Sequence, residues 1–250
     1  MSMPQTKHIP KEREEIMPVN SLPRRNFLTK MFGAAAITSV AVSCTKSLTS
    51  AGDVSANSLT ADGGSLTANT LSMGNSDYAV LNYAYLLEQL EAQFYTTVTA
   101  SYYSGASDWE KTRLAQIRDH EIAHREFFKN ALSTYAIPQI TFNLSAIDFT
   151  SRASVLGTAR TFEDLGVGAY NGAGKYIKNP DYLTLAGKIV SVEGRHAAYI
   201  RDLLEPVSFS DRTIVNAMGL DKAIHPETVI KSVIPFLPFS VNTSKAPWNR

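Results

Sequence analysis

The chain has 250 residues, of which 44% are hydrophobic and 19% are charged, a composition typical of folded rather than disordered proteins. Its formal net charge is +1 and its lysines and arginines are scattered, so nothing indicates a nucleic-acid partner. The single cysteine, Cys44, excludes an intramolecular disulfide.

Residues 1–43 have the features of an export signal. Arg24 and Arg25 precede an apolar run, residues 31–43, which is too short to span a bilayer. The segment resembles a twin-arginine signal. The alternative is that the two arginines are chance neighbours and that the run forms a core helix.

The apolar run ends in AVSC, which is similar to the lipobox that precedes a lipid-modified cysteine, with Ala41 where leucine is commonest. Cys44 is therefore a candidate lipid anchor. Residues 44–76 are rich in Ser, Thr, Gly, Asn and Ala and contain no aromatic residue. Such a segment buries too little to fold alone, so we expect a flexible tether.

From Asp77 the apolar residues recur with a helical period. Helices are expected over residues 77–100, 108–135, 151–173 and 182–204. The connection that contains Pro138 is long, whereas the turn at residues 179–181 is short. Residues 77–205 are therefore predicted to form an all-α four-helix bundle with one long crossover.

Residues 206–250 are less regular. A short helix is expected near residues 225–233, followed by the proline-broken apolar run VIPFLPF, for which strand and loop are equally compatible. We expect this extension to pack on the bundle as a cap.

The predicted second helix contains the stretch DHEIAHREFF, in which Glu121 and His124 share the apolar stripe of Ile117, Phe128 and Leu132. Burying either polar group without a partner is costly, so the pattern indicates a partner inside the core. The predicted fourth helix repeats this pattern of a glutamate and a histidine in an apolar stripe.

In that fourth helix Glu193 and His196 have the same spacing, and residues three apart on a helix project from one face about one turn apart. A single Glu-x-x-His pair is usually a solvated polar pair. Two pairs that both lie in an apolar stripe indicate a shared buried site.

Each remaining helix has a glutamate on its stripe, Glu88 in the first and Glu163 in the third. Tyr95 follows Glu88 by seven residues, and Tyr170 follows Glu163 by the same interval. Both tyrosines are candidates for core aromatics whose hydroxyls reach a ligand carboxylate. Glu91 is the alternative to Glu88, which we prefer because of the Tyr95 match.

Four inward glutamates would repel one another, so this core should be unstable or should hold protons unless cations are present. Two divalent cations would offset the four negative charges. Imidazole nitrogen and carboxylate oxygen together suit iron or manganese. A Glu plus Glu-x-x-His from each half is the arrangement of di-iron and di-manganese carboxylate bundles.

On these residues, the segment 77–204 resembles the ferritin-like superfamily, and within it the exported bacterial ferritin-like domain proteins related to desiccation-associated proteins. The resemblance implies a dinuclear iron or manganese centre that reacts with dioxygen or hydrogen peroxide. It implies as metal ligands Glu88, Glu121, His124, Glu163, Glu193 and His196.

Many relatives carry an aspartate just before a Glu-x-x-His pair, where it holds the opposite histidine. Here His120 and Val192 occupy these positions, and Asp119 or Asp164 is expected to substitute. We interpret His120, like His8 and His225, as an ordinary polar residue.

Four glycines of the third helix also call for an explanation, because glycine within a helix costs about 1 kcal/mol relative to alanine. They are expected to permit close helix approach or to leave room above the metals. These are Gly166, Gly168, Gly172 and Gly174.

The sequence therefore favours a periplasmic or cell-envelope lipoprotein of oxidase, peroxidase or ferroxidase type that acts in stress protection. The alternative is a non-enzymatic stress or interaction protein, in which metal is structural or absent. Self-association as a homodimer stays open.

Overall fold

The computed structural model describes residues 58–60, 64–67 and 69–249. The expected signal at residues 1–43 and the candidate anchor Cys44 lie outside the described residues. Within the described part of the chain, every helix is too short or too polar to traverse a membrane.

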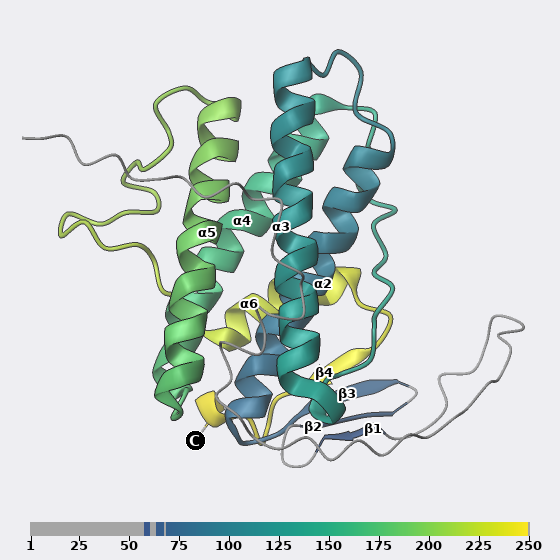
Figure 1. The fold of residues 1–250 in the computed structure, drawn as a ribbon, viewed down its shortest axis with the longest axis vertical. Coiled ribbons are helices and arrows are strands. Elements are labelled where there is room, and N and C mark those ends of the chain that lie inside the picture. The colour runs from purple at the N-terminus through teal and green to yellow at the C-terminus, as the bar shows by residue number, and fades with distance from the viewer. Residues whose placement is uncertain (1–57, 61–63, 68, 250) are drawn as a thin grey trace, which may run out of the picture. The chain divides into compact units, whose positions relative to one another are not determined.

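The predicted four-helix bundle is confirmed (Figure 1). The helices are α2 (Asp77–Ala100), α3 (Asp108–Leu132), α4 (Arg152–Ala173) and α5 (Pro180–Leu204). Helix α2 packs mainly against α3, and α4 packs mainly against α5. The second helix ends earlier than expected, and a 3-10 turn (Ser133–Tyr135) continues it.

Local sequence explains where the helices begin. Ser107 and Glu110 form a capping box at the start of α3, in which each side chain satisfies the other's backbone N–H. The Ser151 hydroxyl accepts from a backbone N–H of α4. Asn179 caps α5, and Pro180 follows at the first helical position, where no N–H is needed.

The long crossover between α3 and α4 runs along α2, where amide side chains hold it. Asn82 accepts from the N–H of Ile137 at 2.8 Å, and Gln89 accepts from the N–H of Ile140 at the same distance. Gln93 accepts from the N–H of Phe142 and donates to its carbonyl. These bonds satisfy buried backbone groups that neither helix nor sheet pairs.

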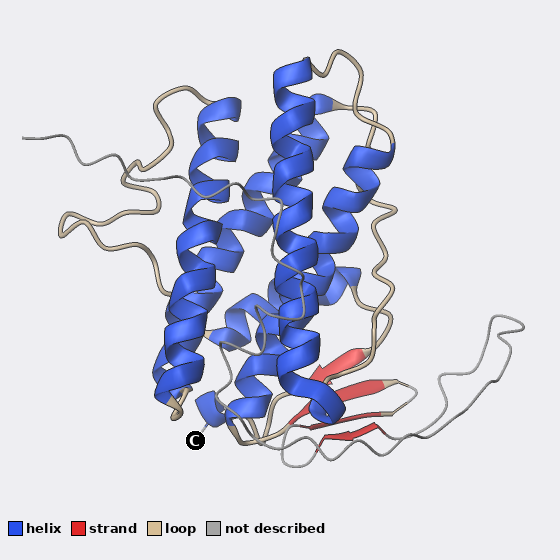
Figure 2. Cartoon of the chain, in the orientation of Figure 1, coloured by secondary structure: helices blue, strands red, loops and turns tan. Residues whose placement is uncertain are grey.

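A small four-stranded sheet lies at one end of the bundle (Figure 2). Its strands, in spatial order, are β1 (Ser58–Thr60), β2 (Gly64–Leu66), β3 (Thr70–Met73) and β4 (Ser240–Asn242). The first three pair antiparallel, whereas β3 and β4 are parallel.

The prediction of a flexible tether over residues 44–76 is therefore wrong for its last part. Leu66, Leu71 and Met73 are buried, and the C-terminal strand β4 supplies hydrogen-bonding partners for β3. A segment that cannot fold alone gains order here because it completes a sheet with the other end of the chain.

The C-terminal extension packs on the bundle as expected. Its short helix α6 (Pro226–Val233) contacts α4. Just before it, the N–H of Ile224 donates to the carbonyl of Gly168 at 2.8 Å. A Cβ atom on Gly172 would lie 1.8 Å from the carbonyl oxygen of Ile224. These two glycines therefore permit close approach of the extension, rather than of another helix.

Candidate metal centre

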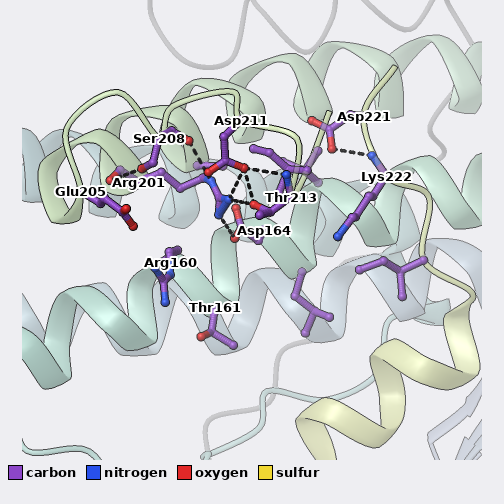
Figure 3. A pocket seen from close by; sticks show the side chains of 15 residues that line it. Arg160, Thr161, Asp164, Arg201, Glu205, Ser208, Asp211, Thr213, Asp221 and Lys222 are labelled. Carbon is purple, nitrogen blue, oxygen red and sulfur yellow. Dashed lines mark hydrogen bonds and ion pairs between the residues drawn. The ribbon is translucent and has the colours of Figure 1, made fainter. Parts of the chain in front are cut away.

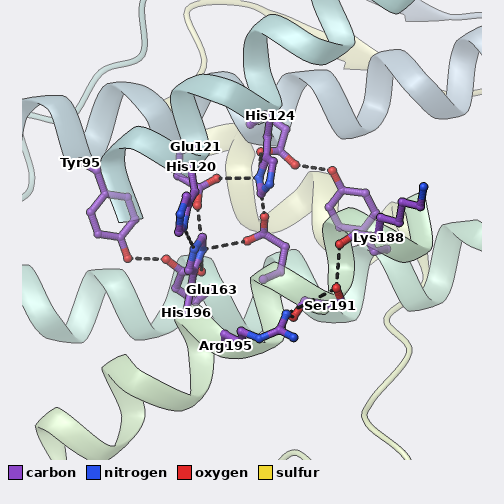
Figure 4. Close-up of polar contacts among 12 residues, drawn as sticks. Tyr95, His120, Glu121, His124, Glu163, Lys188, Ser191, Arg195 and His196 are labelled. Atoms are coloured by element: carbon purple, nitrogen blue, oxygen red, sulfur yellow. Dashed lines mark hydrogen bonds and ion pairs between the residues drawn. The ribbon is translucent and has the colours of Figure 1, made fainter. Parts of the chain in front are cut away.

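All six predicted ligands meet inside the bundle, from four different helices (Figure 4). Helix α2 contributes Glu88 and α4 contributes Glu163, while α3 and α5 each contribute a Glu-x-x-His pair. The four carboxylate residues are fully buried. The side chain of His124 retains 12% exposure and that of His196 retains 5%, so the histidines form the edge nearest to solvent.

The six residues form two groups of four, and Glu121 and Glu193 belong to both. In the first group, the Nδ1 of His124 lies 2.8 Å from Oε1 of Glu193, 3.4 Å from Oε2 of Glu88 and 3.6 Å from Oε2 of Glu121. The donor atoms of each group lie within 4.8 Å of one another, which is a spacing that one central ion can bridge.

The second group repeats the first around His196. Its Nδ1 lies 2.8 Å from Oε1 of Glu121, 3.5 Å from Oε2 of Glu163 and 3.6 Å from Oε2 of Glu193. Each shared glutamate thus turns one oxygen to each group. Glu121 and Glu193 therefore link the two groups, while Glu88 with His124 and Glu163 with His196 each belong to one group.

The donor atoms that face the group centres lack hydrogen-bond partners among the described residues. Their contacts are short, but the atoms do not point at one another as a donor and acceptor do. The buried atoms concerned are Glu88 Oε2, Glu163 Oε2, both carboxylate oxygens of Glu121 and of Glu193, and the Nδ1 atoms of His124 and His196. Buried polar atoms are rarely left unpaired, and this oxygen and nitrogen set suits divalent iron or manganese. The residues therefore fit a metal site.

Glu88 and Glu163 each belong to one group only, and in each of them the oxygen that faces away from the group accepts a hydrogen bond from a tyrosine. Each tyrosine lies on the other helix of the α2 and α4 pair. Tyr95 of α2 donates its hydroxyl hydrogen to Oε1 of Glu163, and Tyr170 of α4 donates to Oε1 of Glu88. Each bond leaves the other oxygen of its glutamate free to face the group. The interpretation of both tyrosines as partners of these carboxylates is confirmed.

The electrostatics of the cluster are those of crowded buried carboxylates. Burial, with repulsion by Glu193, raises the pKa of Glu121 to about 8. Burial lowers the pKa of His124 and of His196, but the carboxylates that face them outweigh it and raise both pKa values. Burial alone would raise the pKa of Glu193. The two imidazoles in front of it have the larger combined effect and lower that pKa to about 2. Without metal ions, protons on imidazole and carboxylate take the place of cations.

His120 has a structural role that the sequence analysis missed. Its Nδ1 lies 2.9 Å from the Nε2 of His196, the ring nitrogen that faces away from the second group. The interpretation of His120 as an ordinary polar residue is therefore wrong. Its position, directly before a Glu-x-x-His pair, was the available signal, because an aspartate there is expected to hold the opposite histidine.

The two aspartates expected to substitute do not reach a histidine. The carboxylate of Asp119 accepts from Arg118 on the surface. Asp164 pairs with the buried Arg201 at 2.8 Å. That expectation is wrong for both residues.

Glu91, the alternative to Glu88, lies outside both groups. It is also buried, and burial together with the charges of the surrounding glutamates raises its pKa well above the ordinary value. Its Oε1 would lie 3.2 Å from a Cβ atom on Gly166, so this glycine leaves room for Glu91.

A cavity of about 530 Å³ lies between α4, α5 and the segment 205–224 (Figure 3). Its wall contains Arg201, which pairs with Asp164 and with Asp211. None of the six clustered Glu and His residues lines it. The cavity is therefore a feature separate from the candidate metal centre.

The fold and the cluster define the class: a four-helix bundle with a buried group of glutamates and histidines that is compatible with metal binding. A family model described as a ferritin-like domain matches residues 76–206, more than half of the chain. The chain therefore belongs to the ferritin-like domain family. No curated protein matches it.

Proposed function

We propose that this protein binds two iron or manganese ions and uses them in redox chemistry on dioxygen or hydrogen peroxide, in protection against stress. The observation that carries the proposal is the sharing of Glu121 and Glu193 between two otherwise separate donor groups. A single-ion site would need neither a second histidine nor a second terminal glutamate.

The protein's own residues hold the ions and shape their surroundings. Glu88 and Glu163 would each hold one ion, and Glu121 and Glu193 would contribute an oxygen to both ions. His124 and His196 supply one nitrogen each. A bound pair of these ions supplies electrons, one from each metal, to a small oxidant.

The two tyrosines keep the terminal carboxylates in place. By donating to the outer oxygens of Glu163 and Glu88, Tyr95 and Tyr170 orient the inner oxygens toward the ions. The four carboxylate residues of the cluster are fully buried, so water has no access from their side. A small oxidant would then approach from the histidine edge, where His124 is partly exposed.

The test has two stages. Metal content of the purified protein, measured by mass spectrometry after loading with Fe(II) or Mn(II), should approach two ions per chain. The loaded protein should then consume hydrogen peroxide or dioxygen faster than the same protein after chelation. A protein that binds two ions but consumes neither oxidant would favour the alternative, in which the metal is structural.

We also propose that the protein is exported and held at the cell envelope through Cys44. The support is the sequence alone, namely Arg24 and Arg25 before an apolar run that ends in AVSC. Lipid labelling of Cys44→Ala in cells should be lost, and the variant should leave the membrane fraction. Labelling that persists in this variant would overturn the proposal.

A further inference from the structure

The two donor groups have almost identical inner contacts, and they differ clearly at the far side of each histidine. The three carboxylate distances from Nδ1 are 2.8, 3.4 and 3.6 Å for His124 and 2.8, 3.5 and 3.6 Å for His196. Each terminal glutamate has its tyrosine. These inner contacts give no reason for the two metal positions to differ.

His120 breaks this equivalence. It contacts the Nε2 of His196 at 2.9 Å, whereas the Nε2 of His124 has no hydrogen-bond partner among the residues that the structure describes. Val192 stands before Glu193 where His120 stands before Glu121, and an isopropyl group cannot accept a hydrogen bond. The chain therefore supplies an outer partner to one histidine and not to the other.

The geometry of the His120–His196 contact is that of a well-directed hydrogen bond. The two ring planes differ by only 8°, and the ring centroids are 5.2 Å apart. Because the two nitrogens are closer than stacked rings can approach, the rings meet edge to edge rather than face to face. The bond therefore lies in the plane of both imidazoles, along the direction of the ring N–H.

The direction of this bond follows from ligation. A metal ion on the Nδ1 of His196 leaves the hydrogen on Nε2, which then donates to the Nδ1 of His120. His120 itself is exposed, so its own N–H can face water. An outer acceptor of this kind fixes the tautomer and orientation of a ligating histidine and raises its basicity, and its loss typically lowers metal affinity about 10–100-fold.

We propose that His120 makes the two metal positions unequal, so that the position at His196 binds a divalent cation more tightly and fills before the position at His124. The inference rests on the proposed dinuclear site and adds an order of loading to it. His120 acts as a positioning residue, through His196.

The test is a titration of metal-stripped protein with Co(II), followed by visible absorption in the presence of a competing chelator. Wild-type protein should bind two ions in steps whose affinities differ about 10–100-fold. His120→Ala should weaken the tighter step by the same factor and leave the other step unchanged. Its metal-free form should still unfold cooperatively, with a melting temperature lowered at most by the loss of one part-buried hydrogen bond.

Two further variants make the readout specific. In His120→Asn the amide oxygen occupies the place of the imidazole Nδ1, since both atoms are bonded to Cγ, so the tight step should be restored. Val192→Ala changes the matched position of the other half and should leave both steps as in the wild type.

Removal of each histidine assigns the steps. In His124→Ala the remaining step should be tight and sensitive to the His120→Ala change. In His196→Ala it should be weak and insensitive to that change. Equal steps in the wild type, or His120→Ala weakening both steps or neither, would overturn the proposal. If the wild type bound no metal, the proposed function would fall as well, whereas two bound ions with no effect of His120 would remove this inference alone.

Discussion

The Nδ1 atom of His196 on α5 lies 2.8 Å from Oε1 of Glu121 on α3. The reciprocal contact, from His124 of α3 to Glu193 of α5, has the same length. Each Glu-x-x-His pair therefore places its glutamate against the histidine of the other pair. The two helix pairs interlock through these contacts, and a change to either glutamate acts on both donor groups.

For this reason Glu121→Ala and Glu193→Ala should each lower metal content from about two ions per chain to well below one. Each change removes one oxygen from both donor groups, rather than one ligand from a single group. Metal analysis after loading and desalting measures the effect. Glu126→Ala is the matched control, because Glu126 lies on α3 but its carboxylate accepts from Arg125 at the surface. An unchanged metal content in both cluster variants would contradict the assignment.

Metal removal should lower the melting temperature of the wild-type protein. An ion that binds only the folded state at a free concentration 100 times its Kd stabilises that state by about 2.7 kcal/mol. For a protein of this size the shift in Tm is roughly 5–10 °C. Differential scanning calorimetry with chelator, and again after Fe(II) or Mn(II) is restored, should show a fall and a recovery. Identical melting in all three states would argue against a metal site.

Metal-free protein should lose stability as the pH rises from about 5 to 8. The pKa of Glu121 is about 8 in the folded state, so the folded state holds a proton here that the unfolded state has released. The raised pKa values of Glu163, His124 and His196 act in the same direction. The lowered pKa of Glu193 acts the opposite way, but only below about pH 5.

Melting temperatures of chelator-treated protein at several pH values within this window would check the trend. Metal-loaded protein should show the reverse trend, because its ligands must be deprotonated and binding therefore strengthens as the pH rises. A metal-free Tm that rises with pH would show that the cluster holds no extra protons.

Tyr95→Phe and Tyr170→Phe should each destabilise the protein by about 1–3 kcal/mol, because each leaves a buried carboxylate oxygen without its donor. Chemical denaturation of the metal-free proteins measures this loss. Tyr83→Phe makes the same chemical change at a buried hydroxyl that has no hydrogen-bond partner within the described part of the chain, so it should cost little. Equal effects at Tyr83 and Tyr95 would mean that the carboxylate contacts contribute nothing.

Gly172→Ala should displace the C-terminal extension from α4, since the new methyl group would lie 1.8 Å from the carbonyl oxygen of Ile224. Limited proteolysis should then cut near residue 224 faster than in the wild type. Gly187→Ala on α5 is the control, because no atom of residues 58–60, 64–67 or 69–249 lies within 4 Å of a Cβ there, apart from its own helix backbone and chain neighbours. That variant should gain up to about 1 kcal/mol from helix propensity alone. Equal proteolysis of both variants would show that the close approach is not required.

The sequence by itself determined the helices and the two Glu-x-x-His pairs of the cluster. The helical period of the apolar residues is a local property, and so is the spacing of three between Glu121 and His124. The sequence of each helix therefore predicts which of its faces is buried. The repetition of the spacing at Glu193 and His196 then indicates that the two faces meet. The capping residues of α3 follow an equally local rule.

Only the tertiary structure decided the contacts between segments that are far apart in the chain. Strand β3 has no sign of its parallel partner in the composition of residues 44–76, because that partner is β4 near the C-terminus. The choice of Glu88 over Glu91 depends on how α2 is rotated about its axis, and both residues are buried. The role of His120 requires His196 to arrive from another helix, 76 residues away in sequence. Local patterns specify which face of an element is buried, whereas the partner across that face is set by packing of the whole chain.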